Sequence, residues 1–173
     1  MNIFYVDSSP ARAAQALGDK HINKMIVEST QMLLNAFPRW RLATSPLRTR
    51  DGFSYRHSYP NHPCSKWVLE SSDNYRWLLH HALALLDERG YRWPSAKKHH
   101  SGLALQWILE QSAIEFPKQT FTQPAQAIPL TALCRADKNF SSADVLSNYR
   151  LYYKLDKKHL HHWTTRTQPL WLD

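Results

Sequence analysis

The chain is poor in glycine, cysteine and acidic residues, and it has no long apolar run. Only four glycines occur among 173 residues, and together with long helical patterns this scarcity indicates an all-α fold. No apolar stretch approaches the length of a membrane span, and the N-terminus has neither a basic start nor a long apolar run, so no signal peptide is indicated. We therefore expect a cytoplasmic protein without a membrane partner.

The two cysteines, Cys64 and Cys134, are not spaced like metal ligands. They suggest reduced thiols of the cytoplasm, with a single disulfide as the alternative. Ten histidines invite a metal hypothesis, but no spacing of histidine, cysteine and carboxylate residues closely matches a known site. We expect neither a metal nor another cofactor.

Positive charge is in excess, with 22 lysines and arginines against 14 acidic residues and a net charge of +8. A cleft in such a protein tends to attract polyanions, although a merely solubilising surface charge would give the same numbers. Hydrophobic residues make up 43% of the chain, which fits a globular protein with a real core. We predict a single all-α domain over residues 1–173, with residues 163–173 as a candidate C-terminal tail.

Apolar periodicity, caps and prolines predict five to six helices after a short extended segment at residues 1–6. The helices are expected at residues 10–17, 19–37, 65–71, 73–89, 96–111 and 143–160. Asp19, Ser72, Ser95 and either Ser141 or Ser142 are the expected N-caps, and Gly90 is the expected end of the long helix before it. Residues 39–59 and 114–140 are predicted to be long loops, the first basic and the second interrupted by prolines.

The expected helix at residues 19–37 carries the strongest functional signal. His21, Lys24, Glu28, Gln31 and Asn35 fall in one line along it, and apolar side chains cover most of its remaining surface. Such a helix is expected to be buried with its polar line facing a cleft or a polar network, where burial shifts pKa values. A base, an amine and a carboxylate within that line indicate chemistry. The alternative is a structural network, because Lys24 and Glu28 are four residues apart and such pairs often only stabilise a helix.

Basic residues elsewhere are interpreted as nucleic-acid contacts. Residues 39–59 interleave arginines with aromatic side chains, and arginine binds phosphates bidentately while aromatic rings stack on bases. Positive side chains also crowd the start of the helix expected at 96–111, a position that favours a bound anion. The end of the last helix is basic as well, which its dipole alone would explain, and we expect it to share one positive face with the arginine loop. The predicted contacts are Arg39, Arg41, Arg48, Arg50, Arg56, Lys97, Lys98, Lys154, Lys157 and Lys158.

Several short motifs occur in the order found in a known family. The Asp-x-His-x6-Glu pattern at residues 19–28 resembles the first helix of pyrimidine-dimer DNA glycosylases of the endonuclease V type, in which the glutamate is catalytic. Tyr-Pro-Asn-His-Pro at 59–63 and the block from Glu88 to Lys97 resemble bacterial relatives of that family. This likeness covers roughly residues 1–100.

A set of small, mostly phage-borne proteins is similar over most of the chain. These proteins share Asp-Lys-His-x2-Lys-Met-x2-Glu, Asn-His-Pro-Cys and Tyr-Arg-x-Tyr-Tyr, which occur here at residues 19–28, 61–64 and 149–153. Each motif is short, and their common order adds weight to the resemblance.

The resemblance implies a compact all-α fold and a reaction on DNA. The best-known members attack the sugar C1′ of a damaged nucleotide with an N-terminal α-amine, form a Schiff base, and use the glutamate in glycosidic cleavage and strand scission. Those members expose an N-terminal threonine after methionine removal. Here Asn2 is not a small residue, so we expect Met1 to be retained, and Lys24 is an alternative nucleophile one turn from Glu28.

We predict a DNA-acting enzyme of the N-glycosylase/AP-lyase type that processes a damaged or modified nucleotide. Glu28 would act as general acid or base or stabilise the sugar cation, Asp19 and His21 would orient or protonate, and Lys24 would be the nucleophile or a phosphate contact. His62, between two prolines, would be presented to the same site or, equally, would cap the helix that follows it. The alternatives are a non-catalytic nucleic-acid-binding protein and an enzyme that acts on free nucleotides or modifies bases.

Overall fold

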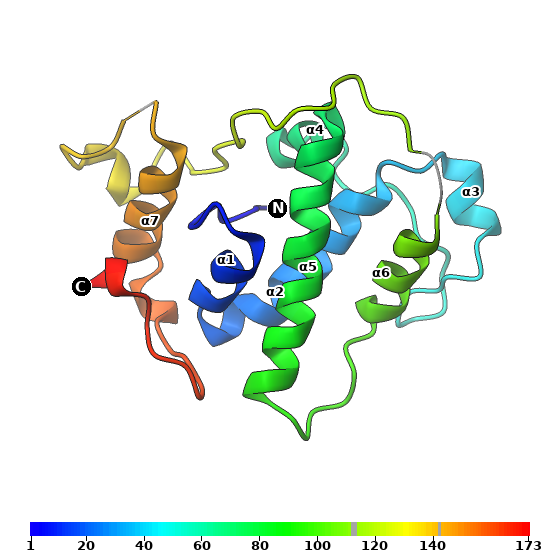
Figure 1. Ribbon diagram of the computed structural model, residues 1–173, viewed down its shortest axis with the longest axis horizontal. Coiled ribbons are helices and arrows are strands. Elements are labelled where there is room, and N and C mark those ends of the chain that lie inside the picture. The colour runs from blue at the N-terminus through cyan, green and yellow to red at the C-terminus, as the bar shows by residue number, and fades with distance from the viewer. Residues whose placement is uncertain (112–113, 142) are drawn as a thin grey trace.

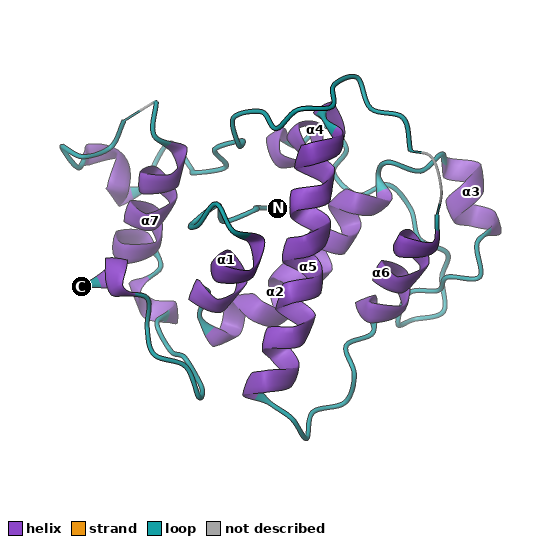
Figure 2. Ribbon diagram, viewed as in Figure 1, coloured by secondary structure: helices purple, strands orange, loops and turns teal. Residues whose placement is uncertain are grey.

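Helices form the whole framework of the protein in the computed structural model, which describes residues 1–111, 114–141 and 143–173 (Figure 1). The α-helices are α1 (Pro10–Ala16), α2 (Asp19–Leu34), α3 (Arg39–Thr44), α4 (Pro63–Glu70), α5 (Ser72–Arg92), α6 (Ser101–Glu110) and α7 (Val145–Asp156). Short 3-10 helices occur at Leu133–Ala136, Lys158–Leu160 and Leu170–Leu172. Within the described ranges no strand is present, as Figure 2 shows, and the expected all-α class is confirmed.

The long helix α5 runs through the middle of the molecule, and α1, α2, α4 and α6 all contact it. Helices α7 and α3 lie at opposite ends of the long axis (Figure 1). The apolar flank of α2 supplies much of the core, with Ile22, Met25, Ile26 and Leu33 fully buried. Along its polar line Lys24 is exposed and Glu28 is partly exposed, whereas His21 and Asn35 are buried. In the part of the chain that is described, no helix is long and apolar enough to cross a membrane.

Helix α5 does not end at Gly90, as expected, but continues to Arg92. The Arg92 guanidinium is fully buried and donates to Glu88, to Asp19 and to the Gln15 carbonyl. These charge-assisted hydrogen bonds offset the cost of a glycine inside a helix, which is about 1 kcal/mol. The N-cap of α5 is Ser71 rather than the expected Ser72, since the Ser71 hydroxyl accepts from the backbone N–H groups of residues 73 and 74.

Three other expected boundaries are wrong. The helix expected at 96–111 begins at Ser101, because Arg89 donates to the Lys97 carbonyl and ties the preceding segment to α5. A helix, α3, occupies part of the expected loop at 39–59. Helix α7 begins after Asp144, whose side chain accepts from the Ser147 N–H, rather than after Ser141; the alternative cap, Ser142, lies outside the described residues.

The ends of α2 also differ from the expectation. Asp19 is the first residue of the helix rather than its cap, which is Gly18. Helix α2 stops at Leu34, three residues before the expected end, and Asn35 is its C-cap. The Asn35 side chain donates to the Ser58 carbonyl and accepts from the Ser58 N–H. The side chain of Asn35 thereby fastens the loop that follows α3 to the end of α2.

Candidate active site

The N-terminal amine and Glu28 meet at the surface of α2. The Met1 nitrogen lies 4.0 Å from Glu28 Oε2, and the Asn2 backbone N–H donates to the same oxygen at 2.9 Å. The Met1 side chain is only 3% exposed, whereas the residue as a whole is partly exposed. The part of Met1 that faces solvent is therefore its main chain, which carries the amine. An amine beside a carboxylate combines a nucleophile with a proton acceptor.

Asn2 fixes the course of the N-terminal segment. Its Oδ1 accepts from the backbone N–H groups of Ile3 at 2.8 Å and Phe4 at 2.9 Å, and its Nδ2 donates to the Ala127 carbonyl at 3.0 Å. Phe4 has a φ of +41°, a left-handed conformation that costs a non-glycine residue about 1–3 kcal/mol. The Phe4 ring packs against His21 and three tyrosines of α7, and this packing holds the strained turn.

His62 and Cys64, at the start of α4, lie near enough to the amine and Glu28 for those charges to shift the pKa values of both side chains. His62 Nδ1 accepts from the Cys64 N–H at 3.2 Å and so caps α4. Burial and the N-terminal amine lower the pKa of His62 while Glu28 opposes them, so the three groups act on one another electrostatically and the imidazole is neutral at pH 7. Burial raises the pKa of the Cys64 thiol to about 12, which leaves it unreactive at neutral pH.

Lys24 lies on the other oxygen of the same carboxylate. Its Nζ is 3.6 Å from Glu28 Oε1, and its side chain is 63% exposed. Lysine nucleophiles are activated by desolvation in an apolar pocket or by a neighbouring cation, and Lys24 has an open surface and a carboxylate instead. Lys24 therefore lacks the desolvation that activates a lysine nucleophile.

His21 lies two turns before Glu28, about 10 Å along the axis of α2, and contacts other groups. The side chain is buried, its Nδ1 is 2.8 Å from the Tyr153 hydroxyl, and its ring packs on Phe4. Burial, followed by the positive charges around it, lowers the pKa of His21 to about 4. His21 is therefore neutral at pH 7 and packs on the N-terminal segment through Phe4.

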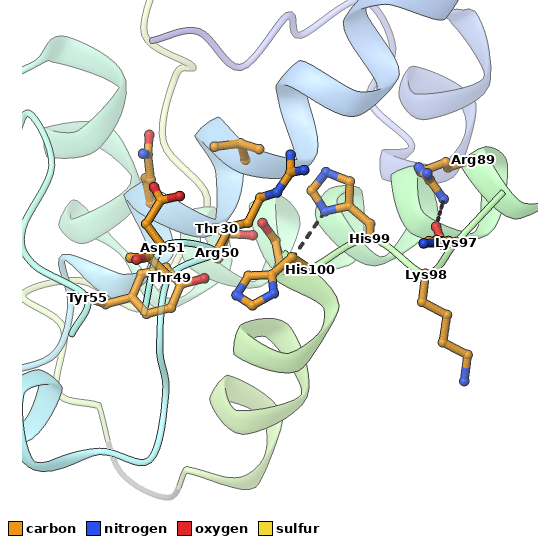
Figure 3. A pocket seen from close by; sticks show the side chains of 13 residues that line it. Thr30, Thr49, Arg50, Asp51, Tyr55, Arg89, Lys97, Lys98, His99 and His100 are labelled. Atoms are coloured by element: carbon orange, nitrogen blue, oxygen red, sulfur yellow. Dashed lines mark hydrogen bonds between the residues drawn. The ribbon is translucent and has the colours of Figure 1, made fainter. Parts of the chain in front are cut away.

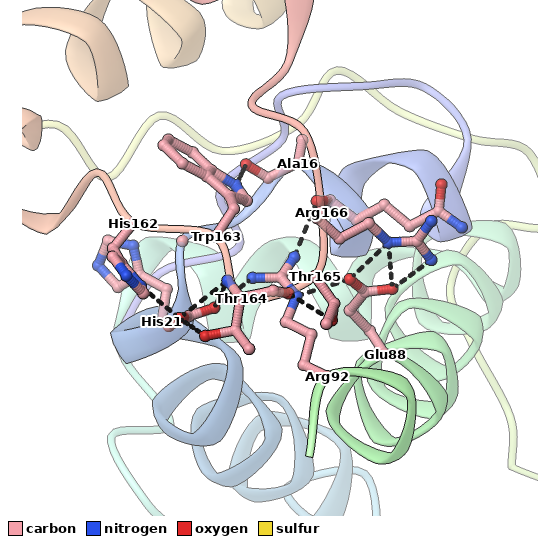
Figure 4. Close-up of polar contacts among 12 residues, drawn as sticks. Ala16, His21, Glu88, Arg92, His162, Trp163, Thr164, Thr165 and Arg166 are labelled. Carbon is pink, nitrogen blue, oxygen red and sulfur yellow. Dashed lines mark hydrogen bonds and ion pairs between the residues drawn. The ribbon is translucent and has the colours of Figure 1, made fainter. Parts of the chain in front are cut away.

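Asp19 binds the C-terminal segment at His162 and at Thr164, which Figure 4 shows close to Arg92 of α5. Its carboxylate accepts from the Thr164 hydroxyl at 2.7 Å, from Arg92 Nη1 at 2.8 Å and from His162 Nδ1 at 2.7 Å. Burial opposes ionisation, but these hydrogen bonds lower the pKa of Asp19 to about 2. The residues after α7 are thus docked on the first turn of α2 rather than forming a free tail.

A basic cavity of about 620 Å³ opens on the flank of α2 (Figure 3). Val27 and Gln31, neighbours of Glu28 on the helix, line it. Its positive side chains are Arg50, Arg89, Lys97 and Lys98, against one carboxylate, Asp51, and the imidazoles of His99 and His100 also line it. Among the described residues, no ion pair neutralises any of these cations. A concave surface with unneutralised positive charge concentrates anions.

The remaining predicted contacts lie outside this cavity. Arg41 donates to the Gln111 side chain, Arg48 to two backbone carbonyls and Lys154 to the Asp173 carbonyl, while the Lys157 ammonium lies over the Tyr152 ring. Arg39, Arg56 and Lys158 are exposed. The expected single positive face is not a compact patch, because α3 and α7 lie at opposite ends of the molecule (Figure 1).

Four contributors were missed by the sequence-based prediction of site residues. His99 and His100 had a usable signal, since they directly follow Lys97 and Lys98 in the sequence, whereas Arg89 lies 8 residues before Lys97 and had no such signal. Asn2 had none, because its bonding partners Glu28 and Ala127 are 26 and 125 residues away along the chain.

Comparison with known proteins identifies one family. The family model described as pyrimidine dimer DNA glycosylase matches residues 1–98, which is more than half of the chain. The matched region includes the N-terminal segment, α2, His62 and the two lysines of the basic cavity, and it ends before α6 and α7. No curated protein and no solved structure matches the chain.

Proposed function

The chain belongs to the pyrimidine dimer DNA glycosylase family, and we propose that it is a DNA glycosylase with AP-lyase activity whose nucleophile is the N-terminal α-amine. The substrate class is a damaged or modified nucleotide in DNA. Family membership suggests activity of this type. The observation that carries the proposal is the Met1 nitrogen 4.0 Å from the Glu28 carboxylate, with the Met1 side chain buried and its main chain exposed.

The reaction uses first the α-amine and then the Glu28 carboxylate. The neutral amine forms a bond to the sugar C1′, the bond from C1′ to the base breaks, and the base leaves with a proton. The sugar ring then opens as the C1′–O4′ bond breaks and the nitrogen forms a double bond to C1′, and Glu28 relays the remaining amine proton to O4′, which gives the Schiff base. The Glu28 carboxylate also stabilises the positive charge that develops at C1′. His62, neutral at pH 7, supplies a second hydrogen-bonding group at the edge of the same site.

The DNA backbone would lie across Lys24 and the basic cavity. Lys24 is the exposed cation nearest Glu28, and Lys97 and Lys98 occupy the cavity on the adjoining flank of α2. Phosphate contacts set the register of a duplex on a protein without reading its sequence. These cations would therefore place the sugar of the target nucleotide against the amine.

Borohydride trapping tests the proposal directly. The protein is mixed with a duplex that contains an abasic site, and with one that contains a pyrimidine dimer, in the presence of borohydride. Mass spectrometry of the trapped peptide identifies the modified nitrogen. It also shows whether the mature chain begins at Met1 or at Asn2; the Asn2 nitrogen is 2.9 Å from Glu28 Oε2, so either start puts an α-amine at the carboxylate.

The expected result is an adduct on the α-amine. An adduct on Lys24 would keep the enzyme class and move the nucleophile to that side chain. Salt-sensitive DNA binding without any adduct, on both substrates, would overturn the proposal and favour the alternative of a non-catalytic DNA-binding protein.

A further inference from the structure

The region that follows the family match holds the N-terminal segment in place. Figure 1 shows that segment lying between α5 and α7, and α7 lies wholly beyond residue 98. Arg150 of α7 donates to the Val6 carbonyl at 2.8 Å, and the Phe4 ring stacks on Tyr152 with an angle of 8° between the ring planes. The Tyr-Arg-x-Tyr-Tyr motif of residues 149–153 is thus turned toward the N-terminus.

A chain of hydrogen bonds runs from Glu28 to Tyr149 through Asn2 and Ala127. The Asn2 N–H donates to Glu28 Oε2 at 2.9 Å, and the Asn2 side chain donates to the Ala127 carbonyl at 3.0 Å. The Ala127 N–H donates to the Tyr149 hydroxyl at 3.0 Å, and that hydroxyl donates to the Ala125 carbonyl at 2.8 Å. Each link joins groups that are far apart in sequence, so the chain fixes tertiary geometry rather than a local turn.

The Tyr149 hydroxyl is suited to anchor the end of this chain of hydrogen bonds. Tyr149 is fully buried, and burial, with the neighbouring Cys64 thiol, raises its pKa well above the usual value. The phenol therefore stays protonated and both donates to and accepts from the segment at residues 125–127. A buried hydroxyl with both hydrogen bonds made holds its partners in one arrangement.

We propose that Tyr149 is a positioning residue for the nucleophilic amine, acting through Ala127 and Asn2 to hold the N-terminus against Glu28. This inference rests on the proposed function. It assigns to the part of the chain beyond the family match a direct role in building the active site. A shift of the amine by about 1 Å would be enough to lower the rate by up to about 10²-fold.

The test compares Tyr149→Phe with Tyr152→Phe. Both changes remove the phenolic hydroxyl of a buried tyrosine in α7, and among the described residues the Tyr152 hydroxyl forms no hydrogen bond. The rate of borohydride trapping is measured at saturating abasic DNA, the dissociation constant for the same DNA in parallel, and the melting temperature for each protein. We expect Tyr149→Phe to trap at least about tenfold more slowly with an unchanged dissociation constant, and Tyr152→Phe to trap at the parent rate.

Equal trapping by folded Tyr149→Phe and the parent protein would overturn the inference and leave the proposed function intact. Absence of trapping by the parent protein would instead remove the proposed function, so the two failures are distinct. If Tyr149→Phe does not fold, Asn2→Asp takes its place. This change keeps the acceptor for the Ile3 and Phe4 N–H groups and removes the donor to Ala127, and trapping at the parent rate by folded Asn2→Asp would also overturn the inference.

Discussion

Replacement of Glu28 by glutamine separates catalysis from stability. The amide keeps an oxygen that can accept from the Asn2 N–H, and it loses the ion pairs with the Met1 amine and Lys24. Because Lys24 is 63% exposed and screened by solvent, the lost pairs together cost about 1 kcal/mol of stability. For a chain of this size that lowers Tm by about 2–4 °C.

The expected loss of activity is far larger. Proton transfer by a positioned carboxylate is worth about 10²–10⁴-fold in rate, which corresponds to about 3–5 kcal/mol of transition-state stabilisation. Single-turnover cleavage and borohydride trapping give the rates, DNA binding gives the affinity, and a melting curve gives the stability.

Glu70→Gln is the matched control. Glu70 also pairs with a lysine, Lys118, and lies on the partly exposed surface of α4, so its loss should leave the rate unchanged. The reasoning would be refuted by a folded Glu28→Gln that reacts within about threefold of the parent rate, or by a loss of activity that only follows a large loss of stability.

Three further predictions concern Lys24, the basic cavity and pH. Lys24→Ala should retain the trapped adduct on the α-amine with weaker DNA binding, whereas loss of the adduct in a variant that still binds DNA would make Lys24 the nucleophile. Lys98→Gln should reduce the slope of log K against log salt by about 1, and the exposed Lys138→Gln, outside the cavity, should leave it unchanged; equal slopes would remove the cavity from the DNA interface. The pKa of His21 is about 4 in the folded protein and about 6.5 in the unfolded chain. The stability that His21 contributes in its neutral form is therefore fully present above pH 6.5, and about 3 kcal/mol of the free energy of unfolding is lost as the pH falls toward 4. His21→Gln should flatten the dependence of the free energy of unfolding on pH between 6.5 and 4, as measured by urea unfolding at each pH. The exposed His80→Gln is the control, and the same pH dependence in His21→Gln and the parent protein would contradict the assignment.

The fold class and most helices followed from local patterns. Apolar periodicity located α2, α5 and α7, because a face that packs on the core must repeat every three to four residues. The boundaries that failed depend on distant partners. Helix α5 passes Gly90 because Arg92 reaches Asp19 in another helix, and no local signal at Gly90 could reveal that contact.

The residues of the candidate site also separate into those that local spacing predicts and those that depend on distant partners. Glu28 and Lys24 were predictable because helical spacing alone puts them on one surface of α2. The N-terminal amine entered only through the resemblance, since its position against Glu28 depends on Asn2 bonding Ala127, 125 residues further along the chain. Sequence periodicity carries no information about such a pairing.

The polar line of α2 also has two different physical environments, which its even spacing conceals. At the start of the helix, His21 is buried against Tyr153 and Asp19 binds Arg92, His162 and Thr164, so these side chains fasten the C-terminal region to α2. Further along, Glu28 is partly open and faces the amine. Buried polar groups require partners whether or not they react. The Asp-x-His-x6-Glu spacing therefore joins an end that docks the C-terminal region to the end at which we propose the reaction takes place, and only the partners supplied by the rest of the chain distinguish the two.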